Sequence, residues 1–153
     1  MNETEIRAGE TLLEMPDAFD AGVYFIGVIH TPWTQRGACP KQGDPREGPD
    51  CRIDIADAFR PALAAFESQS HGQVLYWMDR ARRDLATQSP KADGATRGTF
   101  SLRSPNRPNP IASSLVAIVS VGADHVIVRG LDCLDGTPLI DLKPEKCPEW
   151  AKD

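Results

Sequence analysis

Four short segments of the sequence combine a stiff backbone with polar side chains that can bind a ligand. They are CPKQG (39–43), MDRARR (78–83), LRSPNRPNPI (102–111) and LDGTP (134–138). Each adjoins an apolar, strand-like run, and loops held on a rigid scaffold are where proteins usually place their binding groups. Taken singly, each segment is also typical of a plain turn or a solvated loop. Together they indicate a polar binding site.

The third segment carries two arginines on an unusually rigid backbone. Arg103 and Arg107 flank a run that contains Pro105, Pro108 and Pro110, and prolines restrict the chain to extended conformations. Both guanidinium groups can therefore be held outward, where their planar fork suits a carboxylate or a phosphate. For either arginine alone, an ordinary surface salt bridge is the alternative.

The cysteines and histidines do not have the spacing of a metal site. No CxxC pair occurs among the four cysteines and three histidines, which are Cys39, Cys51, Cys133, Cys147, His30, His71 and His125. Structural zinc sites need such closely spaced ligands, so we expect no metal. Nothing marks the chain as secreted, and we therefore expect reduced thiols.

Charge is distributed unevenly along the chain. The sequence has 17 basic and 22 acidic residues, for a net charge of −5. Residues 1–20 contribute one base and six acids, whereas residues 80–107, the basic segment, contribute seven bases and two acids. A local excess of positive charge attracts a polyanion even on an acidic protein. A solvated basic surface without a partner is the alternative.

The pattern of apolar and turn-forming residues predicts short strands joined by Pro/Gly-rich loops. Runs rich in β-branched residues predict strands at 21–31, 51–55, 72–78, 97–104 and 139–142, and a hairpin from 113–121 and 125–131. Residues 56–67 have a helical period interrupted by Pro61. Residues 31–49, 87–94 and 104–111 are predicted to be loops.

These elements favour a mainly β protein, a barrel or a sandwich. Strands and helices do not alternate regularly, and no GxGxxG follows the first strand, so a Rossmann fold is disfavoured. No run approaches the roughly 20 apolar residues of a membrane helix, and residues 1–20 do not resemble a signal peptide. We therefore expect a cytoplasmic protein with no membrane partner, built as an acidic arm (1–20) and one domain (21–153).

In order along the chain, five runs resemble the TsaA-like tRNA methyltransferases, also called TrmO. They are IGVIHTPW, CPKQ, SHGQVLYWMDRARR, GTFSLRSPNRPNPIASSLV and GLDCLDGTPLIDLKP. The resemblance extends from about Tyr24 to Pro144. It implies a small single-sheeted β-barrel with one or two short helices, usually a homodimer, that binds S-adenosylmethionine without a Rossmann fold. The implied reaction is N-methylation of threonylcarbamoyl adenosine beside the anticodon of tRNA.

The same resemblance implies which residues bind the cofactor. Carried over position by position, they are Pro40, Lys41, Gln42, Asp79, Arg80, Arg103, Leu115, Asp135, Gly136, Thr137 and Pro138. Lysine stands at position 41 where the family usually has arginine, which removes a bidentate fork.

Methyl transfer from a sulfonium to a nitrogen is an in-line displacement, so positioning of donor and acceptor can supply most of the catalysis. The carbamoyl group makes the accepting nitrogen easier to deprotonate, and a weak base or water suffices. The candidate bases are Asp79, His71 and Asp135. For His71, a structural histidine at the edge of the core is the alternative.

The basic segment is the predicted surface for the anticodon loop. Single-stranded RNA is held by cations on its phosphates and by planar groups under its bases. The predicted RNA-binding residues are Arg82, Arg83, Arg97, Arg107 and Asn109, with Trp33 and Trp77 as stacking candidates. Core packing is the alternative for Trp77.

Two other functions fit the same residues. One is a regulatory module that binds S-adenosylmethionine without turnover, and the other is a methyltransferase that acts on a small molecule. Lys41, and Glu145 where tyrosine is common in the family, leave room for the first. If a second copy of the chain covers the basic segment, the small-molecule methyltransferase is favoured.

Overall fold

The computed structural model describes residues 5–145, and these divide into two compact units. Among the described residues, unit 1 is formed by residues 5–22 and 78–112, and unit 2 by residues 23–77 and 113–145. Each unit is described by itself. The division into an acidic arm (1–20) and one domain (21–153) stays a prediction.

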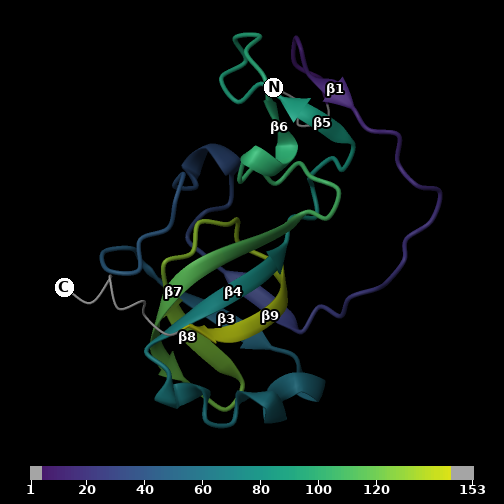
Figure 1. Cartoon of the computed structure of the whole chain (residues 1–153). Coiled ribbons are helices and arrows are strands. Elements are labelled where there is room, and N and C mark those ends of the chain that lie inside the picture. Colours follow the sequence, from purple (N-terminus) through teal and green to yellow (C-terminus); the bar gives the residue numbers. More distant parts are fainter. Residues whose placement is uncertain (1–4, 146–153) are drawn as a thin grey trace. The chain divides into compact units, whose positions relative to one another are not determined.

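Unit 2 is built around a closed six-stranded barrel, visible in Figure 1. Its strands are β2 (Gly27–His30), β3 (Asp50–Ile55), β4 (His71–Trp77), β7 (Ile111–Val121), β8 (His125–Arg129) and β9 (Thr137–Glu145). They follow the order β2-β3-β8-β7-β4-β9 around the barrel. The predicted mainly β barrel, distinct from a Rossmann fold, is confirmed.

Buried apolar side chains from alternate positions of the strands fill the barrel. In β4 every second residue is buried, and Ile29, Ile53, Val74, Val126 and Leu139 are fully inaccessible to solvent. Side chains on a strand point alternately to its two faces, so one apolar set per strand closes the interior. The hairpin of β7 and β8, which was predicted from β-branched runs on either side of a short turn, is confirmed.

Two short 3-10 helices, η2 (Asp57–Leu63) and η3 (Phe66–Ser68), lie between β3 and β4, where the sequence predicts a helical segment. Pro61 lies inside η2 and cannot donate a backbone hydrogen bond, which explains why the segment forms 3-10 turns. A Cβ added at Gly72, near the start of β4, would lie 3.4 Å from the Phe66 ring. The two helices therefore cover the end of the barrel at which β4 begins (Figure 1).

Unit 1 contains a small three-stranded sheet that the sequence analysis missed. Its strands are β1 (Thr11–Leu12), β5 (Leu85–Gln88) and β6 (Arg97–Gly98), in the order β1-β5-β6. Residues of the acidic arm thus form one edge of this sheet. Arg7 Nη1 also donates to the carbonyl oxygen of Ser89 at 2.8 Å.

Several predicted elements have different bounds in the structure. The strand predicted at 97–104 is wrong beyond Gly98, because Thr99–Ser101 form a 3-10 turn, η4. The hydroxyl of buried Thr99 donates to the Leu85 carbonyl at 2.6 Å, which turns that side chain inward. The strand predicted at 21–31 is confined to β2, and β9 is longer than the predicted 139–142. Gln88, predicted in a solvated loop, is a buried end of β5.

Within the described residues, no helix is long and apolar enough to cross a membrane.

Candidate functional site

Three connections leave and rejoin the barrel strands at the same end of the barrel. The antiparallel registers place the ends of β2, β4 and β8 beside the starts of β3, β7 and β9. Residues 31–49 follow β2, residues 130–136 follow β8, and residues 78–110 link β4 to β7 in the sequence. We call this the loop end. All predicted cofactor-binding residues lie in these connections or in the first residues of β7 and β9.

Two glycines bring three of these segments into backbone contact. A Cβ at Gly43 would overlap the carbonyl oxygen of Gly130 and lie 3.2 Å from the carbonyl carbon of Leu131. A Cβ at Gly130 would lie 2.8 Å from the carbonyl oxygen of Leu115. Gly130 also has a φ of 123°, which side chains rarely tolerate. The CPKQG loop, the residues after β8 and the start of β7 therefore form one cluster.

The predicted cofactor-binding residues of this cluster are accessible. Pro40, Lys41 and Gln42 are exposed, directly after the 3-10 turn η1 (Arg36–Ala38). Leu115 is an apolar side chain with 41% of its surface exposed. The cluster thus combines an apolar surface with polar groups, as ligand sites usually do.

The predicted Asp-Gly turn at 135–136 is confirmed, and it is tied to the end of β2. Asp135 Oδ1 accepts a hydrogen bond from the backbone N–H of Thr31 at 3.1 Å and lies 3.2 Å from Nδ1 of His30. The N–H of Asp135 donates to the carbonyl of Trp33 at 2.7 Å. Gly136 has a φ of 84°, in the region that glycine favours. The Asp135 carboxylate therefore stabilises the turn.

His30 connects this turn to β3. Its Nε2 lies 2.9 Å from Oδ2 of Asp54, so the ring bridges the carboxylates of Asp54 and Asp135. Arg52 donates to Asp54 at 2.6 Å. The hydrogen bond from Arg52, together with that from His30, lowers the pKa of Asp54. The ion pairs are about half exposed, so we assign them a positioning role and little stability.

A buried phenol meets a carboxylate at the loop end. Tyr76, near the end of β4, is only 3% exposed, and its hydroxyl donates to Oδ1 of Asp132 at 2.7 Å. The Ser114 hydroxyl lies 2.8 Å from the same phenol oxygen. Burial and the charge of Asp132 raise the pKa of Tyr76 well above its usual range. The phenol therefore stays protonated and remains a donor to Asp132.

The carboxylate of Asp132 also affects the pKa of the Cys39 thiol. Burial raises the pKa of Cys39, and the negative charge of Asp132 raises it further. Both Cys51 and Cys133 are buried, and burial raises their pKa values too, that of Cys133 to about 12. The three described cysteines are unpaired, in line with the expectation of reduced thiols, and Cys147 lies outside the described residues.

We expect the change Asp132→Asn to speed the alkylation of Cys39. Removing the negative charge lowers the pKa of Cys39, so more thiolate, the reactive form, is present near pH 8. Iodoacetamide labelling of the Cys39 peptide, followed by mass spectrometry, should show a rate increase of at least about twofold. The matched change Asp57→Asn, at an exposed residue of η2, should leave this rate unchanged.

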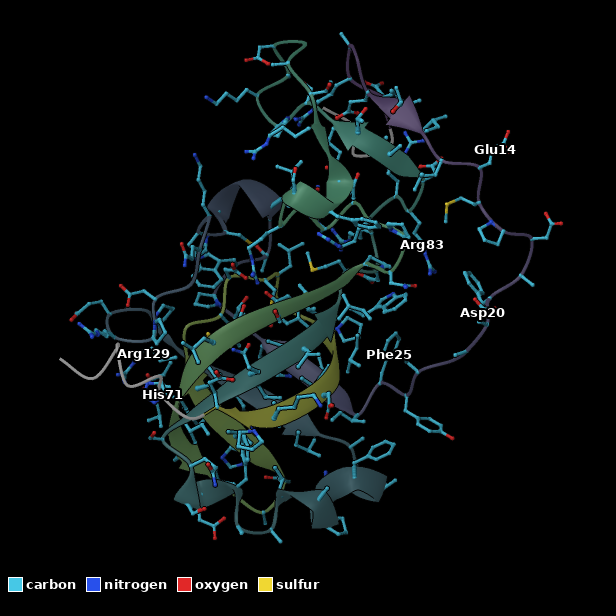
Figure 2. All side chains as sticks on the ribbon, viewed as in Figure 1. Glu14, Asp20, Phe25, His71, Arg83 and Arg129 are labelled. Carbon is cyan, nitrogen blue, oxygen red and sulfur yellow. The ribbon has the colours of Figure 1, made fainter. Side chains whose placement is uncertain are left out.

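His71 lies apart from the cluster. It occupies the first position of β4, next to the 3-10 helices, with Nδ1 3.1 Å from the Ser70 hydroxyl. Trp77, at the loop end, is the last residue of the same strand, and Figure 2 shows His71 near the other end of the barrel. The structure does not bring His71 together with the predicted cofactor residues of unit 2.

In unit 1, two of the predicted RNA-binding arginines hold loops in place. Arg82 donates through Nε and Nη2 to the two oxygens of Asp84, at 2.6 and 3.0 Å, and this pairing lowers the pKa of Asp84. Arg83 donates to the Pro108 carbonyl at 2.6 Å and stacks 4.6 Å from the centre of the Phe19 ring. Arg83 is labelled in Figure 2.

Hydrogen bonds hold the RSPNRPNP loop in addition to its prolines. Arg107 Nη1 donates to the carbonyls of Leu102 and Ser104 at 2.9 and 3.0 Å. Buried Gln88 donates to the Asn106 carbonyl at 2.6 Å. Asp79, Arg80, Arg97, Arg103 and Asn109 are exposed, as a site for a ligand requires.

The two stacking candidates are half-buried. Trp33 follows the end of β2, and its carbonyl accepts the hydrogen bond from the Asp-Gly turn. The Trp77 ring lies 6.2 Å from that of Phe25, centre to centre.

Three residues of the loop end were not predicted as site residues: His30, Tyr76 and Asp132. A signal existed for Tyr76, which falls in the inward phase of β4 with Val74 and therefore needs a partner for its hydroxyl. Asp132 precedes Asp135 by three residues in an apolar run. An acidic side chain in such a run usually needs a hydrogen-bonding partner.

No group of three or more His, Cys, Asp or Glu side chains among residues 5–145 is arranged to hold a metal ion. The absence of a metal stays a prediction.

Comparison with known proteins decides the family. The model of the tRNA-methyltransferase O N-terminal domain matches residues 28–146. The chain belongs to this TrmO family. All the segments that form the loop end lie within the matched range.

Named relatives and solved structures agree with this assignment. A probable S-adenosyl-L-methionine-binding protein of Rhizobium radiobacter, VirR, is 43% identical over 95% of this chain and 83% of its own. A mouse tRNA (adenine(37)-N6)-methyltransferase is 33% identical over 68% of this chain. The crystal structure of TrmO from Pseudomonas aeruginosa superimposes with a TM-score of 0.70 at 27% identity, over 90% of this chain.

The chain is shorter than two of these relatives. It covers 59% of the Pseudomonas aeruginosa chain and 27% of the mouse enzyme.

Proposed function

We propose that this protein is an S-adenosylmethionine-dependent tRNA methyltransferase that N-methylates threonylcarbamoyl adenosine next to the anticodon. The observation that carries the proposal is the backbone contact of Gly43, Gly130 and Leu115, which gathers segments of the TrmO pattern at one end of the barrel. The mouse relative, whose name specifies N6 of adenine 37, supports the position of the methyl group.

The chemistry of the loop end fits this cofactor. S-adenosylmethionine presents an adenine ring, ribose hydroxyls and an amino-acid end, so its site needs an apolar surface beside polar groups. Leu115 offers the first, and the exposed loop at Pro40–Gln42 and the exposed start of the turn at Asp135–Pro138 offer the second. Thr137 of that turn is buried, and its hydroxyl donates to the Leu134 carbonyl. We propose these residues as cofactor-binding, with Asp79, Arg80 and Arg103 of unit 1.

When bound, the cofactor supplies an electrophilic methyl group. The residues of the chain then hold the methyl donor in line with the accepting nitrogen. This positioning makes a bimolecular reaction effectively unimolecular and therefore faster. Of the candidate bases, Asp135 is engaged with His30 and Thr31, and His71 lies at the far end of β4. We therefore retain exposed Asp79 as the proton acceptor, with water as the alternative.

We propose that the basic segment contacts the RNA, with the phosphates bound by its exposed cations, Arg80 and Arg97. Arg82, Arg83 and Arg107 act by shaping the loops beside these cations, since each donates hydrogen bonds within unit 1. Asn109 is exposed; its Oδ1 accepts a hydrogen bond from Arg83 at 3.3 Å, and its amide N–H groups can donate to a base or a phosphate.

Salt dependence tests the RNA surface. We expect Arg97→Ala to weaken tRNA binding and to reduce the slope of log K against log[salt] by about one, because each phosphate contact releases counterions. Binding of S-adenosylhomocysteine should be unchanged. Arg60→Ala, which removes a cation paired with Asp57 in η2, is the control and should keep the wild-type slope. An unchanged slope for Arg97→Ala would remove this residue from the RNA surface.

A regulatory module that binds the cofactor without turnover is the second candidate, because the VirR relative is named only as a binding protein. Transfer of labelled methyl from S-adenosylmethionine to total tRNA separates the two. Label in the tRNA supports the proposed enzyme. Cofactor binding without label in tRNA supports the module, and label in a small-molecule fraction would support a small-molecule methyltransferase.

We also propose that the protein works as a homodimer in the cytoplasm, as the family resemblance implies. Light scattering after size-exclusion chromatography tests the dimer.

A further inference from the structure

Asp132 stands where the three segments of the loop end in unit 2 come together. It follows Gly130 and Leu131, the residues on which Gly43 packs, and it precedes the turn at Asp135. Its charge raises the pKa of Cys39, which places the carboxylate near the start of the CPKQG loop. A half-buried carboxylate is thus surrounded by segments that bind the cofactor in our proposal.

One oxygen of this carboxylate is fixed by the barrel. Tyr76 has a single phenolic hydrogen, which it donates to Asp132, so the hydroxyl of Ser114 must be the donor in its contact with Tyr76. The Ser114–Tyr76–Asp132 chain therefore runs in one direction, from β7 through β4 to the loop end. Tyr76 thus fixes Oδ1 of Asp132, while the side chain is half-buried and keeps part of its surface open to a ligand. The arrangement is that of an anchored acceptor.

The cofactor has donors that match such an acceptor. S-adenosylmethionine carries an ammonium group at its amino-acid end and two hydroxyl groups on its ribose, and a carboxylate accepts hydrogen bonds from either. A carboxylate that is removed from full solvent gains more from such a bond than an exposed one.

We propose that Asp132 is a cofactor-binding residue whose carboxylate accepts a hydrogen bond from the ammonium or the ribose of S-adenosylmethionine. Tyr76 is its positioning residue, because its buried hydroxyl fixes the direction of the carboxylate. The inference rests on the proposed function, since it names a further contact of the same site.

Calorimetric titration of the full chain tests the role of Asp132. The probes are S-adenosylhomocysteine, which has both donor groups, and methylthioadenosine, which lacks the amino-acid end. We expect Asp132→Asn to weaken S-adenosylhomocysteine binding by about tenfold or more, since hydrogen bonds to charged groups are strong. An equal loss for methylthioadenosine assigns the ribose, and an unchanged affinity for it assigns the ammonium.

The change Tyr76→Phe tests the positioning role and keeps the core filled. It should weaken S-adenosylhomocysteine binding by roughly threefold to tenfold while Asp132 is still present, because the carboxylate loses its anchor. The change Asp57→Asn, at an exposed carboxylate of η2, should bind like the wild type. Near-ultraviolet circular dichroism verifies that each variant is folded.

The outcomes separate this inference from the proposed function. If the wild type binds S-adenosylhomocysteine and folded Asp132→Asn binds it within about twofold, Asp132 is not a ligand. If Asp132→Asn does not fold, wild-type affinity in Tyr76→Phe overturns the inference. If the wild type binds neither probe, the cofactor proposal itself fails.

Discussion

Gly43→Ala is expected to displace the CPKQG loop, to lower the stability of the protein and to weaken cofactor binding. The added Cβ would overlap the carbonyl oxygen of Gly130, and neither backbone can move without separating the loop from the residues before Asp132. Forced overpacking of this kind costs about 1–3 kcal/mol, which lowers Tm by several degrees in a domain of this size. Misplacement of the site by about 1 Å should weaken S-adenosylhomocysteine binding by tenfold or more.

A nearby glycine provides the matched control. A Cβ added at Gly37, in η1, would meet nothing within 4 Å. Gly37→Ala should therefore leave both Tm and cofactor affinity close to the wild-type values. Equal effects of the two changes, or no effect of Gly43→Ala, would show that the contact with Gly130 does not build the site. Thermal melts and calorimetry on the three proteins measure both quantities.

Gln88→Ala is expected to loosen the RSPNRPNP loop and to destabilise unit 1. The Gln88 side chain is 5% exposed, and its amide donates to the Thr99 hydroxyl at 3.0 Å and to the Asn106 carbonyl at 2.6 Å. Its removal leaves the Asn106 carbonyl without this donor. The free energy of unfolding should fall by about 2 kcal/mol, the usual cost of unmade buried hydrogen bonds.

Trypsin reports on the loop directly. The Arg103–Ser104 bond lies inside the segment that Gln88 anchors, so cleavage there should be faster in Gln88→Ala than in the wild type. Gln69→Ala, which removes an exposed hydrogen bond to Ser68, is the control and should cleave at the wild-type rate. Unchanged cleavage and stability in Gln88→Ala would mean that the prolines alone hold the loop.

The barrel was predictable because its strands are short apolar runs, rich in β-branched residues and bounded by Pro and Gly. β4 buries every second residue, and the hairpin of β7 and β8 has β-branched residues on both sides of a short turn. The Asp-Gly turn at 135–136 was predictable for a similarly local reason, since it needs a positive φ at Gly136.

The 3-10 turn at Thr99 was not predictable, because the same alternation appears in RGTFSLRS. Its conformation depends on hydrogen bonds from Thr99 to Leu85 and from Gln88 to Thr99, which join residues more than ten positions apart. Residues 1–20 were expected to form a loose arm or an edge segment, but the strand β1 within them could not be located, because two residues are too few to show a period.

Of the candidate site, the sequence could supply the segments but not their contacts. The TrmO-like motifs identified the loops at 39–43 and 134–138, and the barrel brings these together in unit 2. The role of Asp132 could not be predicted, because it depends on the hydrogen bond from Tyr76, which lies 56 positions away in the sequence. The internal roles of Arg82 and Arg83 were also invisible, because their acceptors in the loops become known only from the fold.

The central claim is that the chain transfers a methyl group to threonylcarbamoyl adenosine in tRNA. Its most direct test is to incubate the protein and S-adenosylmethionine with tRNA from cells that lack an enzyme of this type. Mass spectrometry of the digested nucleosides then follows. We expect threonylcarbamoyl adenosine to be replaced by the same nucleoside with one added methyl group, only when the cofactor is present. Unchanged threonylcarbamoyl adenosine, on tRNA shown to carry it and with cofactor binding intact, would contradict the claim.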